Sequence, residues 1–172
     1  MNYKTKLKDI KALVFDVDGV LTDGHVQLIA DGHPTRSFYN RDAFALQAAV
    51  KAGLQVAIIT GGSSEAVKER LQGLGVQDIF LKAYDKEDVM DEYMHRYDFK
   101  SENIAYMGDD LPDLGVMGMV GLSACPHDAA PEIREVADYI SPVNGGRGCV
   151  RDLIEQTLKI QGHWNRPELR RW

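Results

Sequence analysis

A short apolar run near the start of the chain ends in two closely spaced aspartates. Residues Ala12–Phe15 form the run, and Asp16-Val17-Asp18-Gly19 follows directly. A run of this length and character predicts a buried strand, and Gly19 favours a bend just after it. Both carboxylates then lie at the carboxyl end of a strand, where open α/β sheets bind their ligands.

Two carboxylates in such a place suit phosphoryl transfer. One can attack phosphorus and form an aspartyl-phosphate, and the second can protonate the leaving oxygen and later deprotonate water. Two like charges this close also need a cation, and a hard oxygen-seeking metal such as Mg²⁺ is expected. The motif alone does not exclude the alternative, which is an ordinary Asp-x-Asp-Gly turn.

Composition narrows the class of protein. A chain of 172 residues with 44% hydrophobic and 27% charged residues predicts one domain over residues 1–172. The net charge of −6 argues against nucleic acid or an anionic membrane as partner. The two cysteines make neither a disulfide framework nor a zinc spacing. Residues 1–11 lack a signal-peptide core and no apolar run is long enough to span a membrane, so a soluble cytoplasmic protein is expected.

Apolar runs alternate with helix-like segments along the rest of the chain. Strands or short extended elements are predicted at residues 12–15, 56–59, 79–81, 104–107, 120–122 and 139–140. Helices are predicted at residues 42–52, 64–74, 87–97, 131–136 and 150–160. This alternation predicts an α/β fold in which a parallel sheet is covered by helices on both faces.

Two segments lie outside this alternation. Residues 26–29 and 37–39 flank Asp31-Gly32, which predicts a β-hairpin within about residues 22–40, with a plain surface loop as the alternative. The tail, residues 162–172, is expected to be mobile unless it docks. It carries Arg166, Arg170 and Arg171.

Two further positions carry polar groups beyond predicted strands. Thr60 follows the strand at residues 56–59. Its hydroxyl, with the amides of Gly61 and Gly62, suits a phosphate oxygen at a helix start. Lys86 could neutralise a phosphate and an attacking carboxylate as a point charge. Taken singly, each has a plainer explanation: a helix N-cap for Thr60, and a solvated lysine opening a helix for Lys86.

A group of acids follows the predicted strand at residues 104–107. It contains Asp109, Asp110 and Asp113, although one acid would suffice to cap a following helix. Residues three or four apart share a helix face, so repulsion among these carboxylates calls for a cation. Together with the earlier aspartates, threonine and lysine, this group outweighs the separate alternatives.

In this order the motifs resemble the haloacid dehalogenase (HAD) superfamily of phosphohydrolases, which has a three-layer, Rossmann-like fold. The matching motifs are Asp16-Val17-Asp18-Gly19, Thr60, Lys86, and Gly108-Asp109-Asp110 with Asp113. The resemblance implies that Asp16 is the nucleophile and Asp18 the general acid/base. It implies that Thr60 and Lys86 bind the phosphoryl group.

The same resemblance implies a Mg²⁺ site. The metal would be held by Asp16, the carbonyl of Asp18 and Asp109, with Asp110 or Asp113 in support. The chain has no room for a cap domain between Asp18 and Thr60 or between Thr60 and Lys86, so the site of a monomer would be open.

Further motifs resemble one capless branch, the 3-deoxy-D-manno-octulosonate 8-phosphate (KDO 8-P) phosphatases. They are residues 15–24, Asn40-Arg41-Asp42, residues 106–111, and Gly145-Gly146-Arg147-Gly148 with Arg151. The resemblance implies a homotetramer whose hairpins pack together and whose subunits complete one another's sites. Arg41 and Arg147 are candidates for the sugar-acid carboxylate, with surface ion pairs as the alternative.

Two positions depart from the pattern of that branch. Ala43 and Gly62 stand where a glycine and an arginine are usual. Because an arginine at position 62 would contact substrate, a nine-carbon sugar acid 9-phosphate stays an alternative substrate. A non-catalytic binding subunit also stays open. A response-regulator receiver is disfavoured, because its acidic pair precedes its phosphorylated aspartate.

Overall fold

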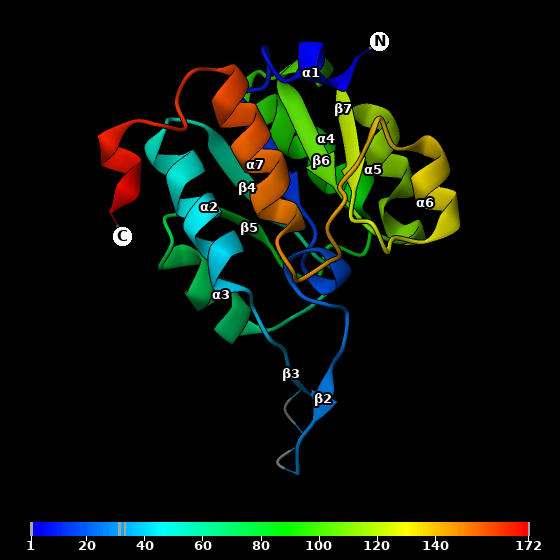
Figure 1. The fold of residues 1–172 in the computed structure, drawn as a ribbon. Helices are drawn as coiled ribbons and strands as arrows, with labels where there is room; N and C mark the ends of the chain where they lie inside the picture. Colours follow the sequence, from blue (N-terminus) through cyan, green and yellow to red (C-terminus); the bar gives the residue numbers. More distant parts are fainter. Residues whose placement is uncertain (1, 31, 33, 172) are drawn as a thin grey trace.

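A parallel sheet forms the centre of the molecule (Figure 1). The computed structural model describes residues 2–30, 32 and 34–171. The strand order is β5-β4-β1-β6-β7-β8. The strands are β1 (Ala12–Phe15), β4 (Gln55–Ile59), β5 (Asp78–Phe80), β6 (Ile104–Met107), β7 (Leu122–Cys125) and β8 (Tyr139–Ile140). The chain proceeds outward from β1 through β4 to β5 and then returns to β6 on the other side of β1. This reversal creates a crevice at the carboxyl ends of β1 and β6.

Helices cover both faces of the sheet. They are α1 (Tyr3–Lys6), α2 (Asn40–Lys51), α3 (Glu65–Gln72), α4 (Lys86–Tyr97), α5 (Leu114–Met119), α6 (Pro131–Val136) and α7 (Cys149–Ile160). Side chains from α2, α3 and α7 pack with Leu13 and Phe15 of β1 in one core. Side chains from α4, α5 and α6 pack with Ala12 and Val14 in the other. Because successive strand residues face opposite ways, β1 is buried on both faces, and the predicted three-layer α/β architecture is confirmed.

The predicted elements mostly coincide with those of the structure, with shifts at their ends. The short element predicted at residues 120–122 is instead β7, which begins at Leu122. The second arm of the hairpin was predicted at residues 37–39, and this is wrong, because β3 is Pro34–Thr35. Phe38 packs against the body of the protein instead of pairing in the hairpin. Neither α1 nor α5 was assigned from the pattern, since both are short.

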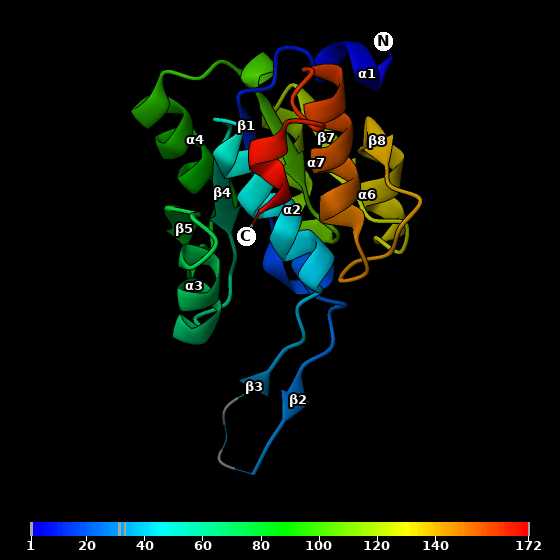
Figure 2. The ribbon, with the colours of Figure 1, turned by 60° about the vertical axis from the view of Figure 1, so that its left-hand side comes forward.

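The hairpin extends away from the sheet as an arm (Figure 2). Its strands are β2 (Gln27–Leu28) and β3, which pair antiparallel. At the predicted turn, Gly32 has a φ of 80° and donates its N–H to the carbonyl of Ile29, whereas Asp31 lies outside the described residues. The apolar side chain of Leu28 is 86% exposed, and Val26 and Ile29 are exposed as well. The arm therefore presents apolar surface that the monomer does not bury.

The tail docks on the body instead of extending into solvent. It forms a helical turn at Pro167–Arg170 that contacts α2, and Leu169 of this turn is buried in the same core cluster. The guanidinium of Arg151 lies 5.2 Å from the ring centre of Trp164. Among the residues that the structure describes, none of the helices combines the length and apolar character that a membrane span requires.

A buried carboxylate connects α2 to the start of α7. Asp42 is 1% exposed, and its Oδ1 accepts the backbone N–H of Arg151 at 2.7 Å. Gly148, at the N-terminus of α7, offers no side chain for capping, so Asp42 serves that end of the helix from a neighbouring one. Its Oδ2 is buried without a hydrogen-bond partner. Burial raises the pKa of Asp42 to about 6, and the amides of Arg151 and Gly148 only partly offset this.

We expect the unfolding free energy of Asp42→Asn, relative to that of wild type, to increase as pH rises. In the folded protein Asp42 holds its proton up to a pH of about 6, whereas in the unfolded chain it releases it near its ordinary pKa of 3.8. Wild-type stability therefore falls as pH rises between these values, by at most about 3 kcal/mol from this group. Asparagine retains the acceptor oxygen and has no charge to desolvate.

Urea unfolding of wild type and Asp42→Asn at pH 4.5 and pH 7.5 measures this difference. A difference in unfolding free energy between the two proteins that is the same at both pH values would contradict the raised pKa.

Candidate functional site

The strand register brings the predicted site residues to one edge of the sheet. Phe15 of β1 is aligned with Ile58 of β4 and with Met107 of β6. Asp16 directly follows β1, and Asp109 comes two residues after β6. All these strands run parallel, so their carboxyl ends open on the crevice at the reversal of strand order.

Lys86 forms a buried ion pair with two aspartates. Its Nζ lies 3.0 Å from Oδ2 of Asp16 and 2.7 Å from Oδ1 of Asp113. All three residues are buried. Burial alone would lower the pKa of Lys86, but the two carboxylates outweigh it and the pKa is raised. The solvated lysine that the sequence left open is thereby excluded.

Asp113 uses both of its oxygens to hold the site together. Besides Lys86, Oδ1 accepts the hydroxyl of Tyr106 at 2.5 Å. Oδ2 accepts the backbone N–H of Asp109 at 2.9 Å and that of Asp110 at 3.3 Å. Asp113 therefore positions Lys86 and the loop after β6. Asp110 is exposed, and its side chain caps the backbone N–H of Leu111 at 2.8 Å.

Three carboxylates converge closely enough to share one cation. Asp16, Asp109 and Asp113 each offer an oxygen, and these oxygens lie within 4.8 Å of one another. Burial raises the pKa of Asp16 to about 7, with Asp113 adding to the effect. Burial also raises the pKa of Asp109 to about 7, with Asp16 and Asp113 contributing. Carboxylates that resist ionisation in this way fit a site that a hard divalent cation completes.

The turn after β1 is shaped to admit these carboxylates. Gly19 has a φ of 84°, and a methyl group on it would collide with the carboxylate of Asp109. A methyl group on Gly145 would collide with the carbonyl of Gly19, and Gly146 donates its N–H to the carbonyl of Val20 at 2.9 Å. The glycine-rich segment before α7 thus packs against the turn that carries Asp18.

Thr60 and Asp18 lie on the other side of the crevice. Thr60 is buried, and its Oγ1 accepts the N–H of Gly62 at 3.1 Å, while Gly61 is exposed. Ser64, and not Thr60, is the N-cap of α3. Both oxygens of Asp18 are bound by Arg36, whose Nε lies 2.6 Å from Oδ1. Sequence reasoning missed Arg36, because nothing near position 36 marks it as a partner of a residue eighteen positions earlier.

Arg41 and Arg147 both line a groove of about 240 Å³. Arg151 of α7 also lines it. Both Arg41 and Arg147 are exposed, and Arg147 lies 3.6 Å from a carboxylate oxygen of Asp23. The structure therefore brings the two predicted carboxylate-binding arginines together, next to the segment that packs on the Asp18 turn.

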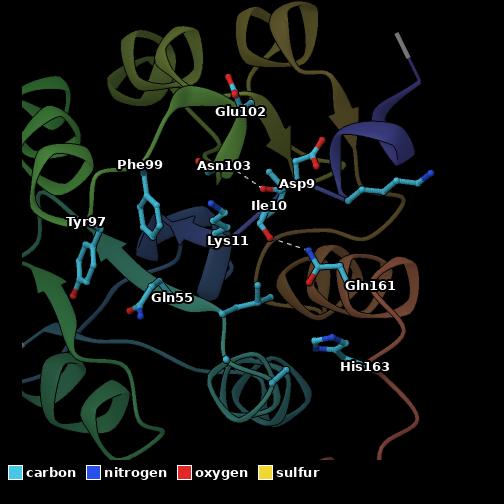
Figure 3. Close-up of a pocket in the computed structure, with 14 residues that line it drawn as sticks. Asp9, Ile10, Lys11, Gln55, Tyr97, Phe99, Glu102, Asn103, Gln161 and His163 are labelled. Carbon is cyan, nitrogen blue, oxygen red and sulfur yellow. Dashed lines mark hydrogen bonds between the residues drawn. The ribbon is translucent and has the colours of Figure 1, made fainter.

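A second hollow, of about 1090 Å³, lies at the opposite edge of the sheet (Figure 3). It is lined by the residues that precede β1, β4 and β6, and its charges are mixed: Lys8 and Lys11 against Asp9 and Glu102. In this hollow the side-chain amide of Gln161, which follows α7, donates to the carbonyls of Leu7 and Ile10 and so connects the end of α7 to the segment before β1. No predicted site residue lines this hollow.

Comparison with known proteins agrees with this geometry. Residues 75–153 match the family model of haloacid dehalogenase-like hydrolases. The fold and the acidic cluster thus define the chain as a haloacid dehalogenase-like hydrolase. The 3-deoxy-D-manno-octulosonate 8-phosphate phosphatase KdsC of Salmonella typhi is 37% identical over 92% of this chain and 84% of its own length. The chain belongs to the family of these phosphatases, and the resemblance stated from the sequence is confirmed.

Solved structures of relatives share the fold. The 3-deoxy-D-manno-octulosonate 8-phosphate phosphatase of Moraxella catarrhalis, solved with magnesium, phosphate and KDO, superposes with a TM-score of 0.92 at 36% identity. The superposition covers 96% of this chain and 95% of that one. The enzyme from Yersinia pestis superposes with a TM-score of 0.91 at 32% identity, over 94% of this chain and 87% of that one.

We expect Asp113→Asn to destabilise the protein and to weaken Mg²⁺ binding. The change removes a charge from a buried ion pair, for which a loss of about 3 kcal/mol in unfolding free energy is typical. It also frees the loop that carries Asp109, and loss of such positioning costs about tenfold in metal affinity. Urea unfolding without metal and calorimetric titration with Mg²⁺ measure the two effects.

Asp110→Asn is the matched control, because its side chain is exposed and asparagine caps a helical turn equally well. Equal stability of the two variants would contradict the role of Asp113.

We also expect Mg²⁺ affinity to rise with pH up to about 7 and then to level off. Below that pH, Asp16 and Asp109 hold protons that the cation must displace. Each displaced proton makes the affinity about tenfold stronger per pH unit. Calorimetry between pH 5.5 and 8 tests this, and Asp109→Asn should give weaker binding with a shallower slope. Affinity independent of pH between 5.5 and 7 would refute it.

Proposed function

We propose that the protein is a Mg²⁺-dependent phosphatase that hydrolyses KDO 8-P to KDO and phosphate, in lipopolysaccharide sugar synthesis. The observation that carries the proposal is the buried contact of Asp16 with Lys86, beside the carboxylate of Asp109. That contact provides a nucleophile, a fixed positive charge and a cation site at one sheet edge. The activity and the metal named for the relatives agree with it.

In the proposed first step, a carboxylate oxygen of Asp16 attacks phosphorus. The bond between phosphorus and the oxygen on C8 of the sugar acid breaks, and its electron pair stays on that oxygen. Asp18, as the general acid, donates a proton to the same oxygen. Lys86 neutralises part of the charge on the attacking carboxylate and the phosphoryl group.

In the second step, water attacks the aspartyl-phosphate. Asp18 accepts the proton of the water, and the electron pair of the broken bond returns to the carboxylate of Asp16. The hydroxyl of Thr60 and the exposed amide of Gly61 would hold phosphoryl oxygens throughout. Mg²⁺, held by Asp16, the carbonyl of Asp18 and Asp109, would neutralise the negative charge brought together in the site.

Recognition of the sugar acid is assigned to Arg41 and Arg147. They line one groove, and two guanidinium groups can bind a carboxylate with paired hydrogen bonds. The close packing of Gly145 and Gly146 on the Asp18 turn supports a link between this groove and the site. Gly62 stands where an arginine is usual in this branch, which is why a nine-carbon sugar acid 9-phosphate stays the second candidate substrate.

A homotetramer is proposed as the working form. Its support is the exposed apolar surface of the hairpin arm, at Val26, Leu28 and Ile29. Packing of arms from several subunits would bury this surface and cover a site that has no cap domain. A cytoplasmic location is proposed with it, where the sugar acid phosphate would be made and used.

Phosphate release with Mg²⁺ from KDO 8-P, beside a nine-carbon sugar acid 9-phosphate, tests the function. We expect kcat/KM to favour KDO 8-P by at least about tenfold, the discrimination that a pocket achieves against one extra carbon. Asp16→Asn is the control, with a loss in kcat of at least about 10³-fold. The reverse preference would assign the longer sugar, activity on neither would favour a non-catalytic role, and full turnover by Asp16→Asn would refute the covalent route.

We expect Leu28→Glu to dissociate the oligomer. Leu28 is 86% exposed in the monomer, so the change should affect only contacts between subunits. Sedimentation velocity measures the shift to smaller species. Val136→Glu, at an exposed valine of α6 away from the arm, is the control. Unchanged sedimentation of Leu28→Glu would contradict packing through the arms.

A further inference from the structure

Arg36 links the hairpin arm to the active-site edge. It follows β3 on the returning chain, and its Nε donates to Oδ1 of Asp18 at 2.6 Å while Nη2 donates to Oδ2 at 3.1 Å. One guanidinium therefore binds the whole carboxylate. The side chain of Arg36 is only 14% exposed, although Thr35 and Ser37 beside it are exposed. A guanidinium that is shielded to this extent and bound through two of its three nitrogens is held in place and is not a freely solvated surface charge.

The chain on either side explains this orientation. Phe38, two residues on, packs against the core of the body. Arg36 therefore stands where the returning chain reaches the body, and it does not depend on the outer end of the arm. Its guanidinium enters a narrow space that it lines together with Asp18, Thr60 and Gly62.

Gly62 lies beside the carboxylate that Arg36 binds. A methyl group on Gly62 would lie 3.3 Å from Oγ1 of Thr60 and 3.9 Å from Oδ2 of Asp18. Any long side chain at position 62 would thus start next to the carboxylate that Arg36 binds. Among the described residues that line this space, Arg36 alone carries a positive charge. Lys86, the cation of the Asp16 side, is already bound by two carboxylates.

We propose that Arg36 is a substrate-binding residue, whose guanidinium binds the phosphate oxygens of the substrate on the Thr60 side of the site. The proposal rests on the phosphatase function proposed above. A phosphomonoester dianion offers the same paired oxygens as a carboxylate, with more charge, and therefore competes with Asp18 for the guanidinium. In the free protein Asp18 keeps Arg36 in position, and substrate binding transfers it from the carboxylate to the phosphate.

Titration of inorganic phosphate into the Mg²⁺-loaded full chain tests this without requiring turnover. We expect Arg36→Gln to weaken phosphate binding about tenfold, as loss of one charge-assisted contact does. The KM for the phosphate ester should rise in parallel. Arg70→Gln is the matched control: Arg70 lines the neighbouring cavity with Arg36 but binds Asn40 and makes no contact with Asp18. Its phosphate affinity should stay within about twofold of wild type.

A second variant separates charge from anchoring of the arm. Arg36→Gln combined with Gly62→Arg supplies a guanidinium from the opposite wall, next to Thr60, without restoring the link to the arm. Regained phosphate affinity in the folded double variant supports the proposal, and no regain overturns it. Unchanged phosphate affinity in Arg36→Gln also overturns it, even if the oligomer is altered.

The same titrations keep this inference apart from the proposed function. If wild type binds phosphate but hydrolyses neither sugar acid phosphate, the phosphatase proposal fails while a weakened Arg36→Gln still supports Arg36. If wild type hydrolyses KDO 8-P and Arg36→Gln binds phosphate as wild type does, the function stands and the inference about Arg36 fails.

Discussion

The contact of Lys86 with Asp16 and Asp113 is the interaction on which the rest of the site depends. Removing these charges from water is costly, and the cost is offset only because each has close partners. Asp113 is the best satisfied of the three, with the ammonium, the Tyr106 hydroxyl and two backbone amides bound to its oxygens. It thereby ties the start of α4 to the loop after β6, and both to the end of β1. Asp16 obtains its position and its positive neighbour from this network.

The network carries more negative than positive charge, and this excess favours binding of a cation. Lys86 balances one carboxylate, so Asp16, Asp109 and Asp113 together exceed it. Without a metal the protein relieves the excess by keeping protons on Asp16 and Asp109, whose pKa values are raised to about 7. A divalent cation would relieve the excess better and would leave Asp16 ionised, the form that the proposed nucleophilic attack requires. The excess of carboxylates thus lowers the stability of the metal-free protein and raises its affinity for a cation.

The other wall of the crevice is made by chain segments that the sheet does not hold. Asp18 lies on a turn packed against the glycine-rich segment before α7, and its carboxylate is bound by Arg36 from the hairpin arm. Asp42 holds the start of α7 through its contact with Arg151. This wall therefore responds to the arm and to α7, whereas the Asp16 wall is fixed by the strands. The two walls thus depend on different parts of the chain: one on the sheet, the other on the arm and the segment before α7.

The sequence by itself determined the α/β class, the positions of most strands and helices, and the residues of the acidic edge. Those features depend on short-range signals: apolar runs, glycines, and acids that directly follow strands. Only the tertiary structure decided that β3 precedes residue 37, that Asp113 holds Lys86, that Arg36 binds Asp18, and that Asp42 serves α7. Three of these features are contacts between residues far apart in the chain. The fourth, the position of β3, is a local feature that depends on such contacts, because Phe38 packs against the body. The strand order and the close approach of glycine backbones set these pairings, and neither is encoded in any single stretch of residues.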